Sequence, residues 1–330
     1  MKVIGTDWGW QGKPEPQALT LSEHSWQTPN KGDVLIKNTA IALNPVDWKS
    51  LEWNLPSWQA GHAAGVDGVG EVIAVGQDVH LPLGTRVAYH QDLMRNGSFA
   101  THTLISAKAA LPIPDALADI VAATLPCTGL TAWQAVEKIP VSGNRDLLVV
   151  GGGSSVALYC IQLALQKGFR VWTTAAARHH SFLSELGVAG AFDYHDLSWR
   201  DTLQKSLGHR KLYAAIDTVG QANAESLIPL IGYNGHIVCV QDRLSEASIP
   251  PFTTAISLHE VALNAIYRYG TELDWSELRQ SAGVMFNQLC MGALLPPHID
   301  SFAYQSLSET LQTLKAGLEA GKRVCVFPKA

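Results

Sequence analysis

A glycine-rich turn near the middle of the chain limits the possible folds more than any other feature. Residues 149–157 read Val-Val-Gly-Gly-Gly-Ser-Ser-Val-Ala, so an aliphatic run passes through three glycines into helical spacing. A strand, a tight turn and a helix in this order are typical of a dinucleotide-binding unit, because N–H groups at the helix N-terminus bind the pyrophosphate. The predicted cofactor contacts in this turn are Gly151, Gly152, Gly153, Ser154, Ser155 and Val156.

The turn departs from the usual G-x-G-x-x-G pattern. With Gly152 as the first glycine, the second position is Ser154 and the last is Ala157. Alanine is permitted at the last position. Ser154 puts a side chain where the backbone should approach phosphate. Its hydroxyl could donate to that phosphate, or Ser154 or Ser155 could be an ordinary helix N-cap.

The second strand of the unit indicates which cofactor binds. NAD sites carry an acidic residue about 20 positions beyond the glycines, where it holds the ribose 2′-hydroxyl. Residues 171–180 contain no acid, and Arg178 and His179 follow Thr174. A 2′-phosphate requires a cation, so we expect NADPH rather than NADH, with Thr174, Arg178 and His179 near it. The alternative is that these basic residues are only a solvated helix start.

Strands and helices alternate from about residue 120 onward, which predicts an α/β fold with a doubly wound parallel sheet. In such sheets ligands bind at the carboxyl ends of the strands, so Val240 and Gln241 should lie near the nicotinamide. Asp217 should cap a helix entry. The expected strands are 147–150, 169–174, 212–217 and 236–240, and the expected helices are 155–166, 179–186 and 222–230.

The two ends of the chain differ from this centre. Short β-branched runs between Gly, Pro, Asn and Asp dominate residues 1–120, and residues 307–327 predict one amphipathic helix and one strand. We therefore expect one domain formed by residues 1–120 together with 270–330, and a Rossmann domain over 121–269 inserted between its two parts.

Composition excludes several classes of function. The net charge is −5 and no dense basic block is present, so nucleic acid is not an expected partner. Five widely spaced cysteines suit neither a disulfide framework nor a zinc knuckle, which favours a reducing cytoplasm. The charge-free residues 147–166 contain three glycines, so they predict a strand, a loop and a buried helix rather than a membrane span.

Five further motifs complete the pattern: residues 44–49 (Asn-Pro-Val-Asp-Trp-Lys), 65–76, 95–100, 125–133 and 321–324. In this order and spacing the chain resembles the medium-chain dehydrogenase/reductase superfamily, in its zinc-free quinone-oxidoreductase-like (zeta-crystallin-like) branch. The resemblance implies a GroES-like β-rich catalytic domain and an active site in the cleft between the domains. It also implies a homodimer that forms through the edge strand of the Rossmann sheet, which we expect at residues 259–269.

The resemblance also bears on zinc. Zinc-dependent relatives place a cysteine where Asn44 stands and Gly-His-Glu where residues 65–67 read Gly-Val-Asp. His62 is four positions early for the zinc histidine, and we expect it on the surface or in a loop. No cysteine precedes Cys127, so the usual sulfur ligands of a structural zinc site are missing. We expect no metal.

Without a metal, hydrogen-bond donors must stabilise the charge that develops on the substrate oxygen. Asn44 is the first candidate, and Tyr89 and His90 are candidate proton donors. The alternatives are a strand residue with a wet hydroxyl for Tyr89 and a loop histidine for His90. Trp48 and Asp47 are expected in the substrate cleft, with Asp47 orienting its loop.

The resemblance places Thr131 near the nicotinamide, and Lys322 either at the cofactor phosphates or among the surface charges of a turn. The predicted function is zinc-independent transfer of a hydride from NADPH to a small enone, quinone or aldehyde. Many relatives carry a tyrosine shortly after the Asn-Pro segment, and residues 51–55 contain none, which weakens a preference for quinones. The alternatives are a non-catalytic NADPH-binding sensor or regulatory protein, and a zinc alcohol dehydrogenase.

Overall fold

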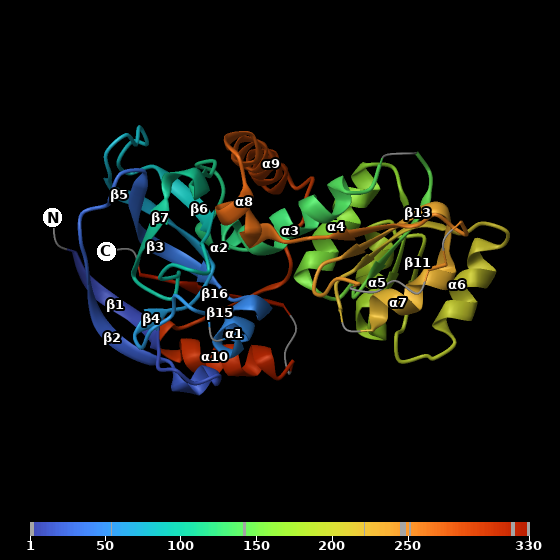
Figure 1. The fold of residues 1–330 in the computed structure, drawn as a ribbon, viewed down its shortest axis with the longest axis horizontal. Coiled ribbons are helices and arrows are strands. Elements are labelled where there is room, and N and C mark those ends of the chain that lie inside the picture. Colours follow the sequence, from blue (N-terminus) through green and yellow to red (C-terminus); the bar gives the residue numbers. More distant parts are fainter. Residues whose placement is uncertain are drawn as a thin grey trace. The chain divides into compact units, whose positions relative to one another are not determined.

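A computed structural model describes residues 3–53, 55–140, 143–220, 222–244, 249–250, 252–317 and 321–328. The chain divides into two compact units, one of Met1–Leu130 with Asn264–Ala330 and one of Thr131–Leu263. The second unit therefore begins later and ends earlier than the predicted 121–269. One reason is that α3 (Pro126–Glu137) begins in the first unit, where the Cys127 N–H bonds to the Asp67 carboxylate. Figure 1 shows the strands of the first unit in blue, teal and red, because both ends of the chain contribute to it.

The first unit is rich in β structure. A three-stranded sheet has the order β2-β1-β4, and a second sheet has the order β15-β16-β3-β5-β6-β8, with β7 paired to β3. The strands are β1 (Val3–Trp10), β2 (Thr20–Trp26), β3 (Asp33–Ala42), β4 (His62–Ala63), β5 (Asp67–Val75), β6 (Arg86–His90), β7 (His102–Ser106), β8 (Leu111–Pro112), β15 (Ile299–Phe302) and β16 (Lys322–Val326).

The register of this larger sheet gathers polar side chains at one end. Ala42, at the end of β3, pairs with Asp67 at the start of β5 and with Val324 near the start of β16. Asp67 also pairs with His90 at the end of β6. Since the paired strands run antiparallel, the end of one lies beside the start of the next. Residues far apart in sequence therefore meet at this end of the sheet.

Helices cover the first unit. Three tryptophans, Trp8, Trp10 and Trp58, join Leu307 and Leu311 of α10 in one buried hydrophobic cluster, so α10 packs its apolar face on this unit. The helices are α1 (Pro45–Glu52), α2 (Asp119–Ala122), α8 (Ile266–Tyr269), α9 (Glu272–Met291) and α10 (Leu307–Lys315), with 3-10 turns η1 (Pro16–Ala18), η2 (Ala107–Ala109), η5 (Leu263–Ala265) and η6 (Tyr304–Ser306). The predicted helix 307–318 begins where expected but ends at Lys315, and Leu318 lies outside the described residues.

The second unit is a parallel six-stranded sheet in the order β11-β10-β9-β12-β13-β14, which is the 3-2-1-4-5-6 order of a Rossmann fold. Its strands are β9 (Asp146–Val150), β10 (Arg170–Thr174), β11 (Gly190–Phe192), β12 (Leu212–Asp217), β13 (Ile231–Cys239) and β14 (Ser257–Glu260). Its helical segments are α4 (Ser155–Gln166), η3 (Ala177–His179), α5 (His180–Glu185), α6 (Trp199–Leu207), α7 (Asn223–Leu227) and η4 (Ile228–Leu230).

The predicted α/β alternation is confirmed: the α4 and β12 bounds match the sequence, and β9 and β10 differ by one residue. The sequence reading assigned no element between 187 and 211, where β11 and α6 lie. A strand of three half-buried residues gives too short a pattern to recognise. The short third strand was therefore missed together with the helix that follows it.

The predicted edge strand over 259–269 is largely wrong. Strand β14 ends at Glu260, and the chain then forms the short helical segments η5 and α8. Asn264 Nδ2 donates to the Gln91 carbonyl at 2.9 Å and the Tyr267 hydroxyl donates to the His90 carbonyl at 2.5 Å. These two bonds hold the segment against the end of β6 within the first unit.

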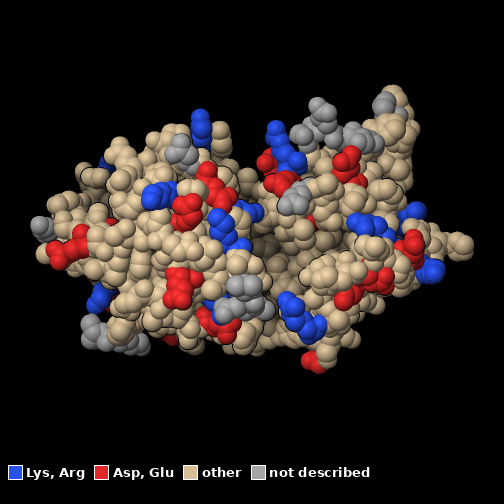
Figure 2. All heavy atoms as spheres, turned by 90° about the horizontal axis from the view of Figure 1, so that it is seen from below, with Lys and Arg blue, Asp and Glu red and all other residues tan. Residues whose placement is uncertain are grey.

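Residues 147–166 form most of β9, the glycine turn and α4. Among the described residues, no helix is both long enough and apolar enough to cross a membrane. None of the five cysteines is in a disulfide. On the face drawn in Figure 2, acidic and basic side chains are scattered among each other over the described residues.

Candidate functional site

Five side chains meet at the end of the larger sheet of the first unit, and we call them the buried polar cluster: Asn44, Asp67, His90, Cys127 and Lys322. Each comes from a different segment. Asn44 follows β3, Asp67 begins β5, His90 ends β6, Cys127 lies in the first turn of α3 and Lys322 begins β16. The sheet register described above brings four of them together, and the first turn of α3 adds Cys127.

Asp67 is the centre of this cluster and its side chain is 0% exposed. Its Oδ1 accepts from the Cys127 N–H at 2.9 Å and lies 3.1 Å from His90 Nδ1. Its Oδ2 accepts from Asn44 Nδ2 at 2.9 Å and lies 3.7 Å from the Lys322 ammonium. Both carboxylate oxygens therefore have donors, and one buried cation balances the charge.

Asn44 has its amide fully engaged. Its Nδ2 donates to Asp67 and, at 3.3 Å, to the Ala42 carbonyl, while its Oδ1 accepts from the Lys322 ammonium. A primary amide has only two N–H hydrogens. A substrate oxygen would have to displace Asp67 or Ala42 to receive a hydrogen bond from Asn44, so the structure argues against the predicted free donor.

Asp47 ties α1 to β5. One carboxylate oxygen accepts from the Asn44 N–H at 2.6 Å and the other accepts from the Val66 N–H at 3.1 Å. Burial is the largest influence and raises the pKa of Asp47 to about 8, with the nearby Asp67 charge adding to it and the backbone donors opposing it. Because the side chain is fully buried and bonded to backbone, Asp47 cannot line a substrate cleft as predicted.

Tyr89 is a core residue. Its hydroxyl is 2.8 Å from Asn38 Oδ1 and 2.9 Å from Thr103 Oγ1, and the side chain is fully buried. Desolvation raises the pKa of the phenol. Of the alternative for Tyr89, the strand position matches the structure and the wet hydroxyl does not, because the hydroxyl bonds to partners outside the buried polar cluster.

His90 is the candidate proton donor that the structure brings into the cluster. It is 8% exposed, at the end of β6 rather than in a loop. A carboxylate only accepts hydrogen bonds, so the contact with Asp67 makes Nδ1 the protonated nitrogen. This contact orients the ring, as the acidic partner does in other His–Asp pairs.

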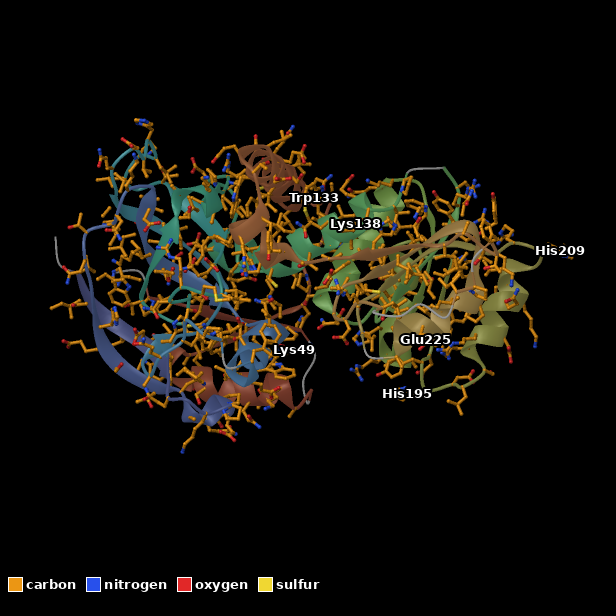
Figure 3. The ribbon with its side chains drawn as sticks, in the orientation of Figure 1. Lys49, Trp133, Lys138, His195, His209 and Glu225 are labelled. Atoms are coloured by element: carbon orange, nitrogen blue, oxygen red, sulfur yellow. The ribbon has the colours of Figure 1, made fainter. Side chains whose placement is uncertain are left out.

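Two aromatic residues of the predicted site region pack against other groups. Trp48 is half-buried on α1, with Lys49 Nζ at 5.7 Å and Lys315 Nζ at 5.6 Å from its ring; Figure 3 labels Lys49 on this helix. His62 is buried in β4 and stacks on Trp58 with ring centroids 4.3 Å apart, and burial lowers its pKa to about 4. The expectation of a surface or loop position for His62 is wrong.

The glycine turn of the second unit has little room for side chains. Gly151 has φ of +85°, in the left-handed region that favours glycine. A Cβ on Gly152 would lie 2.3 Å from Thr173 Oγ1, and one on Gly153 would lie 2.9 Å from the His179 ring. The Ser154 hydroxyl accepts from the Ala157 N–H at 3.2 Å, so the N-cap alternative for Ser154 describes what the structure shows.

Basic groups lie at the end of β10, beside this turn. The Thr174 hydroxyl accepts from the Gly151 N–H at 3.2 Å. Arg178 and His179 follow on η3, with Arg178 exposed and His179 half-buried against Gly153. Burial lowers the pKa of His179, and the neighbouring Arg178 and His180 lower it further. Within the second unit, the His179 ring therefore stands beside the glycine turn, and the cationic side chain of Arg178 precedes it on η3.

Three other predicted cofactor residues lie in two places of the second unit. Thr131 is buried in α3, and Val240 and Gln241 directly follow β13. The Val240 N–H donates to the Asp217 carbonyl at 3.0 Å. Asp217 Oδ1 accepts from the Val219 N–H and from Asn223 Nδ2, so it caps the turn before α7, the role expected for it.

The position of Lys322 differs most from the sequence prediction, which gave the cofactor phosphates or the surface charges of a turn as alternatives. The side chain is only 3% exposed, so it is not a surface charge, and its ammonium bonds to Asn44 and lies near Asp67. Sequence reasoning also gave no role to Cys127, although it recognised the surrounding motif 125–133. No spacing signal links Cys127 or Lys322 to Asp67, because the sheet brings Lys322 near Asp67 and the first turn of α3 brings Cys127 to it.

Three members of the cluster have metal-binding chemistry. One ligand atom each from Asp67, His90 and Cys127 lies within 4.8 Å of the others. Zinc binds carboxylate, imidazole and thiolate groups, so the types are suitable. The surroundings are not: the Asp67 oxygens are engaged by Asn44, Cys127 N–H and His90, and the Lys322 ammonium already supplies the positive charge. As folded, these residues do not fit zinc.

Comparison with known proteins defines the class of this protein. Residues 30–115 match the family described as "Alcohol dehydrogenase GroES-like domain", and residues 155–282 match the family described as "Zinc-binding dehydrogenase". The chain belongs to the medium-chain dehydrogenase/reductase superfamily. The GroES-like and Rossmann assignments made from the sequence are confirmed.

Two curated relatives and one solved structure show what the chain is similar to. It is 32% identical over 217 residues to trans-enoyl reductase opdC of Penicillium oxalicum, and this match covers 58% of each of the two chains. It is 31% identical over 203 residues to trans-enoyl reductase tazE of Aspergillus terreus, and this match covers 56% of this chain and 67% of the relative. The quinone oxidoreductase structure from Coxiella burnetii has a TM-score of 0.80 at 24% identity, over 99% of this chain and all of the other. The match to opdC thus spans less than two thirds of that relative's length.

Proposed function

We propose that this protein is a zinc-independent, NADPH-dependent oxidoreductase that reduces a small α,β-unsaturated carbonyl compound, with quinones and aldehydes as further substrates to test. The observation that carries the proposal is the glycine turn at the carboxyl end of β9, which opens α4 in a 3-2-1-4-5-6 sheet. The names of the two trans-enoyl reductase relatives support an enone over a quinone.

The residues of the turn fit the pyrophosphate of a dinucleotide. Gly151 takes a backbone conformation suited to glycine, and Gly152 and Gly153 leave no space for a Cβ. The first N–H groups of α4 have no partner within the helix, apart from the one that Ser154 caps. These donors and the helix dipole would hold the negative charge. Bound there, a nicotinamide cofactor supplies the hydride.

Arg178 and His179 support a preference for NADPH. They follow β10, where an acidic residue would hold a ribose 2′-hydroxyl in an NAD site, and residues 171–180 contain no acid. Arg178 is exposed and can turn toward a phosphate, while His179 is already placed against Gly153. A charge-assisted contact to the 2′-phosphate would be absent with NADH.

The substrate needs one proton in addition to the hydride, and His90 is our proton donor. Asp67 fixes Nδ1 of the ring, which leaves Nε2 of the protonated imidazole to give its proton to the reduced substrate. Asp67 acts through His90 and is a positioning residue. The ammonium of Lys322 and the amide of Asn44 hold the Asp67 carboxylate in place.

Cofactor titrations test the first part of this proposal. We expect NADPH to bind more tightly than NADH, and Arg178→Ala to weaken NADPH binding about 10-fold or more while NADH binding changes little. Tryptophan fluorescence reports both titrations. Equal losses for both cofactors, or no loss for either, would contradict the 2′-phosphate assignment.

A reduction assay tests the second part. Oxidation of NADPH is followed with a panel of enones, quinones and aldehydes, and His90→Gln is expected to lower turnover about 100-fold while leaving the affinity for NADPH unchanged. The matched control is His80→Gln, because His80 is an exposed histidine of the same unit. Tight NADPH binding with no oxidation on any substrate would favour a non-catalytic sensor instead.

Metal analysis tests zinc independence. The purified protein should contain far less than one zinc per chain, and dialysis against a chelator should leave its turnover unchanged. Stoichiometric zinc, with loss of activity on its removal, would support the zinc alcohol dehydrogenase alternative.

A further inference from the structure

Asp67, His90 and Cys127 lie close together, and a cation that comes from the chain itself lies beside Asp67. The three ligand atoms lie within 4.8 Å of one another, a spacing that one metal ion could bridge. The Lys322 ammonium lies 3.7 Å from Asp67 Oδ2 and bonds to Asn44 Oδ1. Both ends of the Lys322–Asp67 pair are almost fully buried.

The positive charge of Lys322 is opposed by one carboxylate within the cluster. A divalent ion placed among Asp67, His90 and Cys127 would therefore meet a buried ammonium that the same carboxylate already balances. Like charges in a poorly solvated site repel strongly. The buried ammonium would also have to move, although β16 pairs with β3 on one side and β15 on the other and holds Lys322 in the sheet.

We propose that Lys322 occupies the place of a metal ion, and that Asp67, His90 and Cys127 form a latent divalent-metal site that this ammonium keeps closed. The proposal goes beyond the proposed function, which requires only that the protein works without zinc. On binding, the Cys127 thiol would release its proton to solvent and coordinate as thiolate, while His90 would coordinate through a neutral ring nitrogen. Loss of the lysine charge alone should open the site.

Cobalt(II) is the probe, because a cobalt–thiolate bond gives a charge-transfer absorption band that surface sites without sulfur do not give. The variants are Lys322→Gln, which keeps a polar group near Asn44, and Lys322→Arg, which keeps the charge. We expect Lys322→Gln to bind cobalt at least about 100-fold more tightly than the wild type and Lys322→Arg do. Adding Cys127→Ser to Lys322→Gln should remove the band, which separates this site from the exposed Cys290.

A second measurement tests the proposal even if Lys322→Gln folds poorly. If the metal takes the place of the missing charge, cobalt should raise the thermal unfolding temperature of Lys322→Gln and leave that of the wild type unchanged. A wild-type protein that binds cobalt as tightly as Lys322→Gln would overturn the proposal. So would a Lys322→Gln protein that gains neither the thiolate band nor stability from cobalt. Neither readout depends on NADPH, so failure here is distinguishable from failure of the proposed function.

Discussion

The Lys322 ammonium lies 3.7 Å from Oδ2 of Asp67, with the two side chains 3% and 0% exposed. Lys322 begins β16, and Asp67 begins β5, on opposite sides of β3. A buried pair of this kind costs more to break than to form, since removing one partner leaves the other charge without compensation.

Loss of this charge should destabilise the protein. We expect Lys322→Met to lower the free energy of unfolding by about 3–5 kcal/mol, measured by urea denaturation. Asp67→Asn should cost less in the Lys322→Met background than in the wild type, because no charge then remains unbalanced. The control is Lys31→Met, which removes the exposed Lys31–Asp78 pair and should change stability by no more than about 1 kcal/mol.

Asp47 should make stability depend on pH. Its pKa is raised to about 8 in the folded state, so between about pH 4 and pH 8 the folded protein holds a proton that the unfolded chain releases. The Asp47 contribution is therefore present at low pH and is lost as pH rises through that window, by up to about 1.4 kcal/mol per pH unit. Asp47→Asn should flatten the difference between pH 5 and pH 7 in urea unfolding. The exposed control Asp78→Asn should keep the wild-type slope.

Tyr89→Phe should affect stability and not chemistry. The hydroxyl bonds to Asn38 and Thr103 in the core, so its loss should cost about 1–2 kcal/mol in urea unfolding. Turnover of NADPH with an enone should stay within about twofold of the wild type, since the proposed donor is His90. A loss of turnover comparable to that of His90→Gln would restore Tyr89 as the proton donor.

NADPH affinity should depend on pH through His179. Burial and the neighbouring Arg178 and His180 lower the pKa of this ring in the protein without cofactor, so it is neutral at pH 7.5. A 2′-phosphate beside it would raise that pKa again, and binding would then take up a proton. Affinity should rise as pH falls from about 7.5 to 6.5, by up to about 10-fold per pH unit. NADH, and NADPH with His179→Asn, should show little change in the same fluorescence titration.

Ser154→Ala should destabilise α4. Its hydroxyl caps the helix by accepting from the Ala157 N–H, and loss of such a cap costs about 0.5–2 kcal/mol. Ser154→Gly should cost only a few tenths of a kcal/mol. Equal stability of Ser154→Ala and the wild type in urea unfolding would show that the hydroxyl does not act as a cap.

The sequence by itself determined the Rossmann unit. The glycine turn at 151–153 and the alternation of strands with helices are local patterns, and the helix over 155–166 was predicted to the residue. Local patterns also indicated the β-rich character of residues 1–120. They did so because burial on one face of a strand or helix leaves a periodic trace in the order of the residues.

Only the tertiary structure decided which side chains meet. Tyr89 and His90 are adjacent in sequence, yet successive residues of a strand point to opposite faces, so one bonds to Asn38 and the other to Asp67. Lys322 and Cys127 join Asp67 through the register of the sheet and the first turn of α3. Such contacts depend on pairing between distant segments. The periodicity of one segment does not indicate which other segment pairs with it. The burial of the Lys322 ammonium beside Asp67, on which the proposed metal site depends, therefore follows only from the tertiary structure.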